Sequence, residues 1–238
     1  MHPSEPSFRP TLLLLCGLLS DATAWADVAE RAPSDWDVRI VSFEGCRSLE
    51  EMAGRAFVAG PDRFALVGHS MGGRVALEMM RAAPERIDRI GLFNTGAHPP
   101  GEHEALSRGR LVQLARDEGM AAVAAAWLPP MLSPSGAADA ALVARLRAMV
   151  EAQTPDSFTG QTEALLSRRD ARPVLATIAV PTLLLSGTLD SWSPVSQHLA
   201  MQEQIPHARL VAVEGAGHFT ANEKPDAVIE ALSAWMTA

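Results

Sequence analysis

The chain has 238 residues but no tyrosine, only two cysteines and no excess of positive charge. Without tyrosine, no phenolic hydroxyl can take part in any mechanism the chain uses. The cysteines, Cys16 and Cys46, are too few for a disulfide framework and form no metal-ligand pattern. With 20 basic and 28 acidic residues, the net charge is −8, which argues against binding a nucleic-acid backbone. We therefore expect no metal and no nucleic-acid partner.

The apolar run near the N-terminus, Thr11–Leu19, is far shorter than the ~20 residues of a transmembrane helix. Because Ala24-Trp25-Ala26 follows it, a secretory signal is one interpretation. The ten residues before the run carry no net positive charge, and bulky Leu15 precedes Cys16 where a lipoprotein signal needs a small residue. A buried parallel strand ended by glycine is the favoured interpretation. We expect a cytoplasmic chain that does not bind a membrane.

Six short apolar runs alternate with helix-like stretches along the chain. This alternation predicts right-handed crossovers and a parallel sheet covered by helices on both faces. The expected strands are Leu12–Leu15, Val38–Ser42, Phe64–Val67, Ile90–Phe93, Thr182–Leu185 and Leu210–Val213. The expected helices are Asp21–Glu30, Leu49–Val58, Gly73–Ala83, Val195–Gln204 and Pro225–Met236. The sequence thus predicts an α/β fold with a mostly parallel, six-stranded sheet.

The alternation breaks between residues 97 and 172, where no good strand candidate occurs. Alanine- and leucine-rich segments punctuated by prolines predict helices at Ala105–Asp117, Ala121–Leu128 and Ala140–Ala152. The interval is too long for a loop of a compact domain. Because strand–helix alternation resumes at Pro181, a helical insertion covering one end of the sheet is favoured over a second domain. We expect residues 1–238 to form one domain with a helical cap at about 97–172.

The pattern G-x-S-x-G occurs at Gly68–Gly72, between an expected strand and an expected helix. In this context it is typical of a tight strand-to-helix turn that holds the central serine in a strained backbone conformation. A serine hydroxyl is a weak nucleophile unless a base takes its proton. Ser70 is therefore the candidate nucleophile, and a histidine oriented by a carboxylate should accompany it.

Of the seven histidines, His218 is the strongest candidate for the base, because it follows the last expected strand in the flexible segment Gly215–Phe219. Asp190 follows the strand Thr182–Leu185, so it should lie at the same edge of the sheet. The preceding strand, Ile90–Phe93, is followed by Asn94 and Thr95 and offers no acid there. The chain order serine, aspartate, histidine is the one expected for this topology.

Together these motifs resemble the α/β-hydrolase fold family, specifically its small, capped, esterase-like members, from about Pro10 to the C-terminus. The resemblance implies that the first strand leads into an oxyanion loop at Cys16-Gly17, and that the backbone N–H groups of Leu18 and Met71 bind the oxyanion. It implies no metal or organic cofactor. Cys16 stands where the family often has histidine. The short segment before the first strand, where the family often has a β-hairpin, suggests six strands.

The predicted function is a serine esterase that cleaves a small carboxylic ester, thioester or lactone through an acyl-enzyme. The same fold and triad also suit carbon–carbon bond hydrolysis, lyase chemistry, perhydrolysis or a slow-turnover ligand sensor, and sequence motifs do not separate these. Apolar residues in the insertion and beside the triad indicate an apolar pocket for part of the ester. The residues expected to contact substrate are His98, Trp127, Trp192 and Phe219. The expected assembly is a monomer or homodimer.

Overall fold

The computed structural model describes residues 9–237 and contains one six-stranded sheet. The strand order is β2-β1-β3-β4-β5-β6, and every neighbouring pair is parallel. This confirms the predicted α/β fold. The strands are β1 (Thr11–Leu15), β2 (Asp37–Val41), β3 (Phe64–His69), β4 (Ile87–Phe93), β5 (Thr182–Gly187) and β6 (Arg209–Val213).

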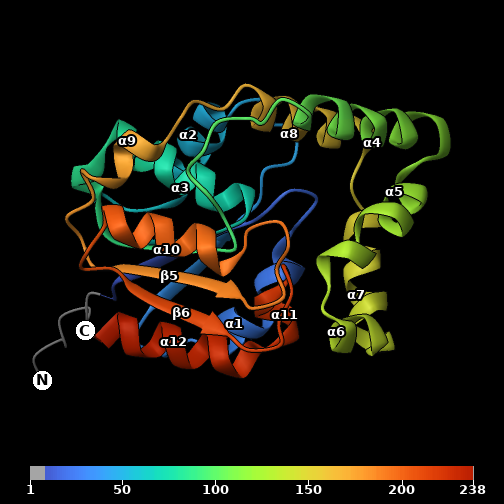
Figure 1. Ribbon diagram of the computed structural model, residues 1–238. Helices are drawn as coiled ribbons and strands as arrows, with labels where there is room; N and C mark the ends of the chain where they lie inside the picture. Colours follow the sequence, from blue (N-terminus) through green and yellow to red (C-terminus); the bar gives the residue numbers. More distant parts are fainter. Residues whose placement is uncertain (1–8, 238) are drawn as a thin grey trace, which may run out of the picture.

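Helices cover both faces of the sheet: α2, α3 and α10 lie on one side, and α1 and α12 lie on the other (Figure 1). The region predicted as one helix, Asp21–Glu30, is instead a 3₁₀ turn at Ala22–Trp25 followed by α1. The helices of the sheet layer are α1 (Ala26–Glu30), α2 (Leu49–Ala59), α3 (Met71–Ala82), α9 (Arg172–Leu175), α10 (Val195–Gln204), α11 (Thr220–Glu223) and α12 (Pro225–Thr237).

The apolar run near the N-terminus forms β1, as the favoured interpretation predicts. Leu12, Leu13, Leu14 and Leu15 are completely buried, because β1 pairs with β2 on one side and β3 on the other. A parallel strand with both neighbours in place and helices over both faces has no polar side, which explains the uninterrupted leucines.

The chain adds β2 on one side of β1 and β3 on the other, so the direction of sheet growth reverses between β1 and β3. Ligand sites of open α/β sheets form at the carboxyl ends of the strands beside such a reversal. Here the two loops that leave these strands pack tightly. A Cβ atom on Gly72 would lie 2.3 Å from the carbonyl oxygen of Leu15, so a residue with a side chain could not occupy this position without a shift of the backbone. The loop after β1 and the start of α3 are thereby brought together.

Between β4 and β5, residues 97–172, which we call the helical insertion, form helices and no strand. Its helices lie at the end of the sheet toward which the strands point (Figure 1). They are α4 (Glu104–Glu118), α5 (Met120–Trp127), α6 (Pro134–Ala138), α7 (Ala140–Glu151) and α8 (Pro155–Leu166). The sequence patterns do not predict α8. Several polar residues of α8 are buried, so it lacks the apolar stripe by which helices are recognised.

Candidate active site

Ser70 lies in the turn between β3 and α3, at the carboxyl edge of the sheet. Its backbone has φ 55° and ψ −113°, a conformation that is uncommon for a residue with a side chain. A Cβ atom on Gly68 would lie 2.2 Å from the carbonyl oxygen of Gly72, so the turn closes only with glycine at that position. The Ser70 N–H donates to the carbonyl of Phe93 at 2.9 Å, which ties the turn to β4. The strained turn predicted from G-x-S-x-G is therefore present.

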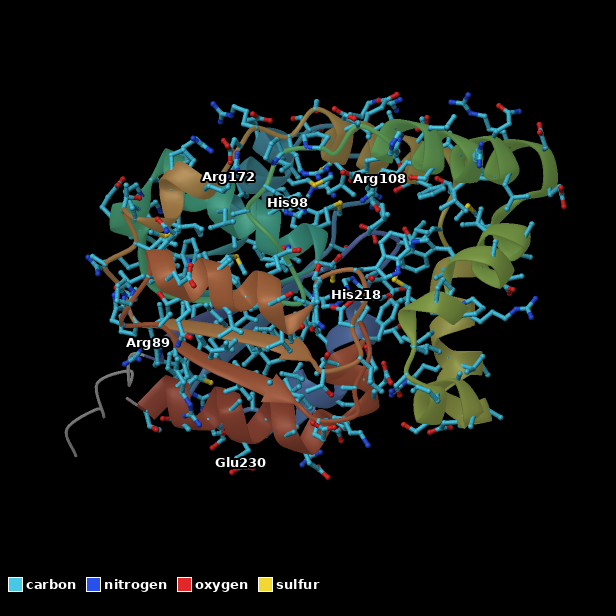
Figure 2. The ribbon with its side chains drawn as sticks, in the orientation of Figure 1. Arg89, His98, Arg108, Arg172, His218 and Glu230 are labelled. Carbon is cyan, nitrogen blue, oxygen red and sulfur yellow. The ribbon has the colours of Figure 1, made fainter. Side chains whose placement is uncertain are left out.

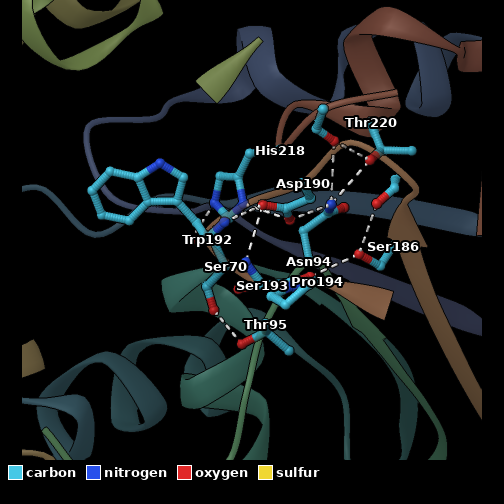
Figure 3. A network of polar contacts seen from close by, with 12 residues as sticks. Ser70, Asn94, Thr95, Ser186, Asp190, Trp192, Ser193, Pro194, His218 and Thr220 are labelled. Carbon is cyan, nitrogen blue, oxygen red and sulfur yellow. Dashed lines mark hydrogen bonds and ion pairs between the residues drawn. The ribbon is translucent and has the colours of Figure 1, made fainter. Parts of the chain in front are cut away.

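Ser70, His218 and Asp190 come together from the loops after β3, β6 and β5 (Figure 3). The Oγ of Ser70 lies 2.9 Å from Nε2 of His218. The Nδ1 of His218 lies 2.9 Å from Oδ2 of Asp190. The side chains of His218 and Asp190 are almost fully buried. The imidazole of His218 thus contacts the Ser70 hydroxyl through one nitrogen and the Asp190 carboxylate through the other, as in a serine–histidine–aspartate triad.

Asp190 is held in its charged form by several hydrogen bonds. Its Oδ1 accepts the N–H groups of Trp192 and Ser193 at 2.8 and 3.0 Å. Its Oδ2 accepts the amide of Asn94 at 2.9 Å (Figure 3). Burial by itself raises the pKa of Asp190, but the facing His218 and these hydrogen bonds outweigh it and hold the pKa well below its usual range. A charged Asp190 favours the His218 tautomer with the proton on Nδ1, which leaves Nε2 free to accept the serine proton.

The backbone of His218 is fixed from two directions. Burial, with a further contribution from His218, lowers the pKa of His69 to about 3, so the His69 ring is neutral and its Nε2–H donates to the His218 carbonyl at 2.8 Å. The His218 N–H donates to the carbonyl of Met131, in the helical insertion, at 2.7 Å. His69, which precedes Ser70, thus helps to fix the backbone of His218.

Leu18 and Met71, the residues expected to bind an oxyanion, both line the cavity that contains Ser70. Within residues 9–237, neither backbone N–H donates to another protein group. The next residue, Leu19, has φ 57° and donates its N–H to Oε1 of Gln161 at 3.0 Å. Two backbone N–H groups without a protein acceptor thus lie in the same cavity as Ser70. They belong to the loop after β1 and the start of α3, which can pack closely because residue 72 is glycine.

The cavity above Ser70 has a volume of about 400 Å³, within the range of small-molecule sites. Of the four residues expected to contact substrate, His98, Trp127 and Trp192 line it, and Trp192 is half exposed. Phe219 is not in its wall. That ring is 1% exposed and packs 5.6 Å from the ring of His69 and 6.0 Å from that of Trp127. The expectation that Phe219 contacts substrate is corrected: it supports Trp127 from behind.

Charged residues in the cavity wall were not predicted from the sequence. Arg74, Glu104, Arg108 and Arg168 all line the cavity. Arg74 could have been found, because it lies in the first turn of the helix expected directly after Ser70. The other three come from the helical insertion, whose packing over the sheet cannot be read from local patterns.

Two further kinds of feature were sought among the described residues: clusters of metal-binding side chains and helices that could span a membrane. Among residues 9–237, no group of three or more histidine, cysteine, aspartate or glutamate side chains could hold a metal ion. None of the helices in this range combines the length and the apolar character required to span a membrane.

A strained serine between a strand and a helix, with a histidine and an aspartate from later strand ends, is an arrangement typical of α/β-sheet hydrolases. The model of the alpha/beta hydrolase family matches residues 12–231. The chain belongs to this family.

Known members of the family resemble the chain over nearly its whole length. A pimeloyl-[acyl-carrier protein] methyl ester esterase of Pectobacterium carotovorum is 27% identical over 99% of this chain and 97% of its own. A thermophilic esterase of Thermogutta terrifontis, solved with malate bound, superposes with a TM-score of 0.88 at 25% identity, covering 96% of this chain and 89% of its own. The enol-lactonase of Burkholderia xenovorans LB400 gives a TM-score of 0.87 at 25% identity, covering 97% and 92%.

Proposed function

We propose that this chain, a carboxylic ester hydrolase, works through an acyl-enzyme formed on Ser70. The observation that carries the proposal is the continuous contact from the Ser70 hydroxyl to His218 and on to Asp190, at 2.9 Å for each step. The relatives support ester chemistry, since the Pectobacterium protein is a methyl ester esterase and two similar structures are an esterase and an enol-lactonase.

In the proposed reaction, Ser70 Oγ attacks the ester carbonyl while His218 Nε2 takes the serine proton. The tetrahedral intermediate collapses, His218 returns the proton to the leaving alcohol, and the acyl group stays on Ser70. Water, activated by the same nitrogen, then attacks the acyl-enzyme and releases the acid. Throughout, Asp190 stays charged and stabilises the His218 imidazolium.

The backbone N–H groups of Leu18 and Met71 are the proposed oxyanion donors. Both are held by backbone packing before charge develops, and such a donor contributes about 3–4 kcal/mol to lowering the barrier. The helical insertion acts as the lid of the cavity and supplies Trp127 to its wall. The substrate is therefore a small ester with an apolar portion; thioesters and lactones fit the same chemistry.

The test is steady-state turnover of p-nitrophenyl acetate by the wild type, Ser70→Ala and Ser167→Ala. Ser167 is an exposed serine at the end of α8 and serves as the matched control. We expect Ser70→Ala to abolish turnover while its circular dichroism stays unchanged, and Ser167→Ala to match the wild type. Retained activity in a folded Ser70→Ala protein would overturn the proposal.

A further inference from the structure

One wall of the cavity is strongly basic, although the whole chain carries a net charge of −8. Arg74 comes from α3, Arg108 from α4, and Arg168 from the segment after α8, and all three line the cavity together with a single acid, Glu104. Figure 2 shows Arg108 beneath α4, on the side of that helix toward His218. Three guanidinium groups and one carboxylate leave an excess of positive charge in this wall.

Arg168 and Glu104 form a structural pair. Two nitrogens of Arg168 contact the two carboxylate oxygens of Glu104 at 2.8 and 2.6 Å, and Arg168 also donates to the carbonyls of Leu165 and Pro99. Glu104 additionally accepts Nε of Arg108 at 2.8 Å. Burial opposes its charge, but the two arginines lower the pKa of Glu104 to about 2. The one carboxylate in this wall is therefore shared between two guanidinium groups.

Arg74 has no carboxylate partner among the described residues. It donates to the carbonyl of His98 at 2.9 Å, and its second terminal nitrogen lies 3.3 Å from His98 Nε2. Burial, and then the positive charges of Arg74 and Arg168, lower the pKa of His98 to about 4, so His98 is neutral. Burial and the nearby Arg168 and Arg108 likewise lower the pKa of Arg74, to about 9. Glu104, which Arg168 and Arg108 already share, offsets part of the Arg74 charge, but no carboxylate of residues 9–237 forms an ion pair with its guanidinium.

Removing a charge from water without a partner is costly, so buried charges are normally paired. Arg74 and Arg108 both line the cavity above Ser70, and within residues 9–237 neither Arg74 nor the terminal nitrogens of Arg108 have a carboxylate partner. We propose that these two arginines bind an anionic oxygen-acid group, a carboxylate or a phosphate, on the ester that this site cleaves. The inference rests on the proposed function, since it specifies the substrate of the same site.

Arg74 also limits how far the anionic group lies from the ester. Arg74 lies in the first turn of α3, where its backbone N–H donates to the Ser70 carbonyl at 3.4 Å, and both residues line the cavity. The anion is therefore a few bonds from the reacting carbonyl, as in the monoester of a short dicarboxylic acid. The apolar side chains of Trp127 and Leu165, which also line the cavity, suit the hydrocarbon that joins the two groups.

The experiment compares hydrolysis of monomethyl glutarate with that of its neutral carboxamide counterpart, methyl 4-carbamoylbutanoate, at constant pH and low salt. The wild type, Arg74→Met, Arg108→Met and Arg147→Met are assayed. Arg147 is an exposed residue of α7 paired with Glu151, and serves as the control for loss of a positive charge in the insertion. We expect the wild type and Arg147→Met to favour the anionic ester at least tenfold in kcat/KM, which is about 1.4 kcal/mol.

In Arg74→Met and Arg108→Met, the preference should fall to within threefold of unity, mainly through a higher KM for the anionic ester. Turnover of the neutral ester by these variants shows that they are folded. Arg74→Lys, which keeps the charge, should recover part of the preference. If the wild type hydrolyses both esters equally well, the inference is wrong while the proposed esterase function stands.

Measuring anion binding to the Ser70→Ala protein tests the role of the arginines independently of ester hydrolysis. Calorimetric titration with glutarate and with glycerol phosphate identifies which anion is preferred. The double variant Ser70→Ala, Arg74→Met should bind the preferred anion at least tenfold more weakly than Ser70→Ala alone. If no ester is cleaved but binding depends on Arg74, the inference holds and the proposed function fails. If neither anion binds, the inference is overturned regardless of the esterase result.

Discussion

The side-chain oxygen of Gln161 accepts a 3.0 Å hydrogen bond from the backbone N–H of Leu19, 142 residues earlier in the chain. Gln161 is 1% exposed and lies in α8 of the helical insertion, whereas Leu19 lies in the loop after β1. The bond holds Leu19 at φ 57°, beside the proposed oxyanion donor Leu18. The insertion therefore positions part of the proposed catalytic machinery as well as covering the cavity.

Replacing Gln161 with methionine keeps its length but removes the acceptor. We expect kcat to fall about tenfold or more with little change in KM, because a donor displaced by a fraction of an ångström stabilises the transition state poorly. The measurement is steady-state kinetics with p-nitrophenyl acetate. Gln113→Met, at an exposed position of α4, is the matched control and should behave as the wild type. A change confined to KM would contradict a role for Gln161 in holding the loop.

Asn94 lies at φ 47° and donates to both Asp190 and Thr220. In Asn94→Asp, two buried carboxyl groups would face each other, and the pKa of one must rise. A carboxyl pKa raised above its unfolded value destabilises the folded state at high pH, and this loss disappears as pH falls below the unfolded value, about 3.9. We therefore expect Asn94→Asp to unfold more easily than the wild type at pH 7, with the difference shrinking toward pH 4.

Asn94→Gly, which tolerates positive φ and adds no charge, is the control for Asn94→Asp. Denaturant unfolding of both variants across this pH range is the measurement. A stability loss of Asn94→Asp that is the same at pH 7 and pH 4, or equal to that of Asn94→Gly throughout, would show that the added charge is not the cause.

Buried His198 makes the fold sensitive to acid. Its ring is completely buried, with Nδ1–H donating to the Pro194 carbonyl at 3.2 Å and Nε2 accepting the Thr95 N–H at 3.3 Å. Burial lowers its pKa from 6.5 to about 4. Between these two values the unfolded chain binds a proton that the folded chain does not. The free energy of unfolding therefore falls as pH drops through this window, by up to about 1.4 kcal/mol per unit.

His198→Asn should flatten that dependence, whatever its effect on stability at pH 7. His207→Asn, at an exposed position, should leave the slope unchanged. Denaturant unfolding at half-unit steps from pH 7 to pH 4 measures the slopes. Equal slopes in the wild type and His198→Asn would show that His198 does not account for this proton uptake.

Two glycines should respond to alanine in opposite directions. A Cβ on Gly72 would lie 2.3 Å from the Leu15 carbonyl, so Gly72→Ala must displace β1 or α3 and cost about 1–3 kcal/mol or more. Gly54 lies on the exposed side of α2, and a Cβ added there would meet no heavy atom within 4 Å. Gly54→Ala should therefore stabilise the fold by about 0.5–1 kcal/mol. Chemical denaturation compares them. A neutral Gly72→Ala would show that the two loops do not pack as tightly as described.

The features of the fold and site that can be predicted from the sequence are those determined by residues close together in the chain. The leucines of β1 indicate a strand that is buried on both faces. The glycines around Ser70 indicate a turn too tight for any residue with a side chain at those glycine positions. Both features depend on neighbours along the chain, so their residue types reveal them. Asp190 and His218 could be selected because strand ends of a parallel sheet share one edge.

The parts that the sequence misses depend on contacts between distant segments. Phe219 follows His218, but adjacency does not set direction, and its ring turns inward against His69. Polar residues of α8, including Gln161, are buried by the rest of the fold and so conceal the helical pattern. The basic wall joins Arg74 to residues of the insertion, and only the packing of that insertion reveals the excess of charge.

An acyl group on Ser70 can be detected by peptide mass spectrometry of the enzyme quenched in acid during turnover of p-nitrophenyl acetate. We expect one added acetyl group on the peptide that contains Ser70, fragmentation that places it on that serine, and no acetylated peptide from Ser70→Ala. An acetyl group on another residue that forms and decays at the rate of turnover, with Ser70 unmodified, would contradict this expectation.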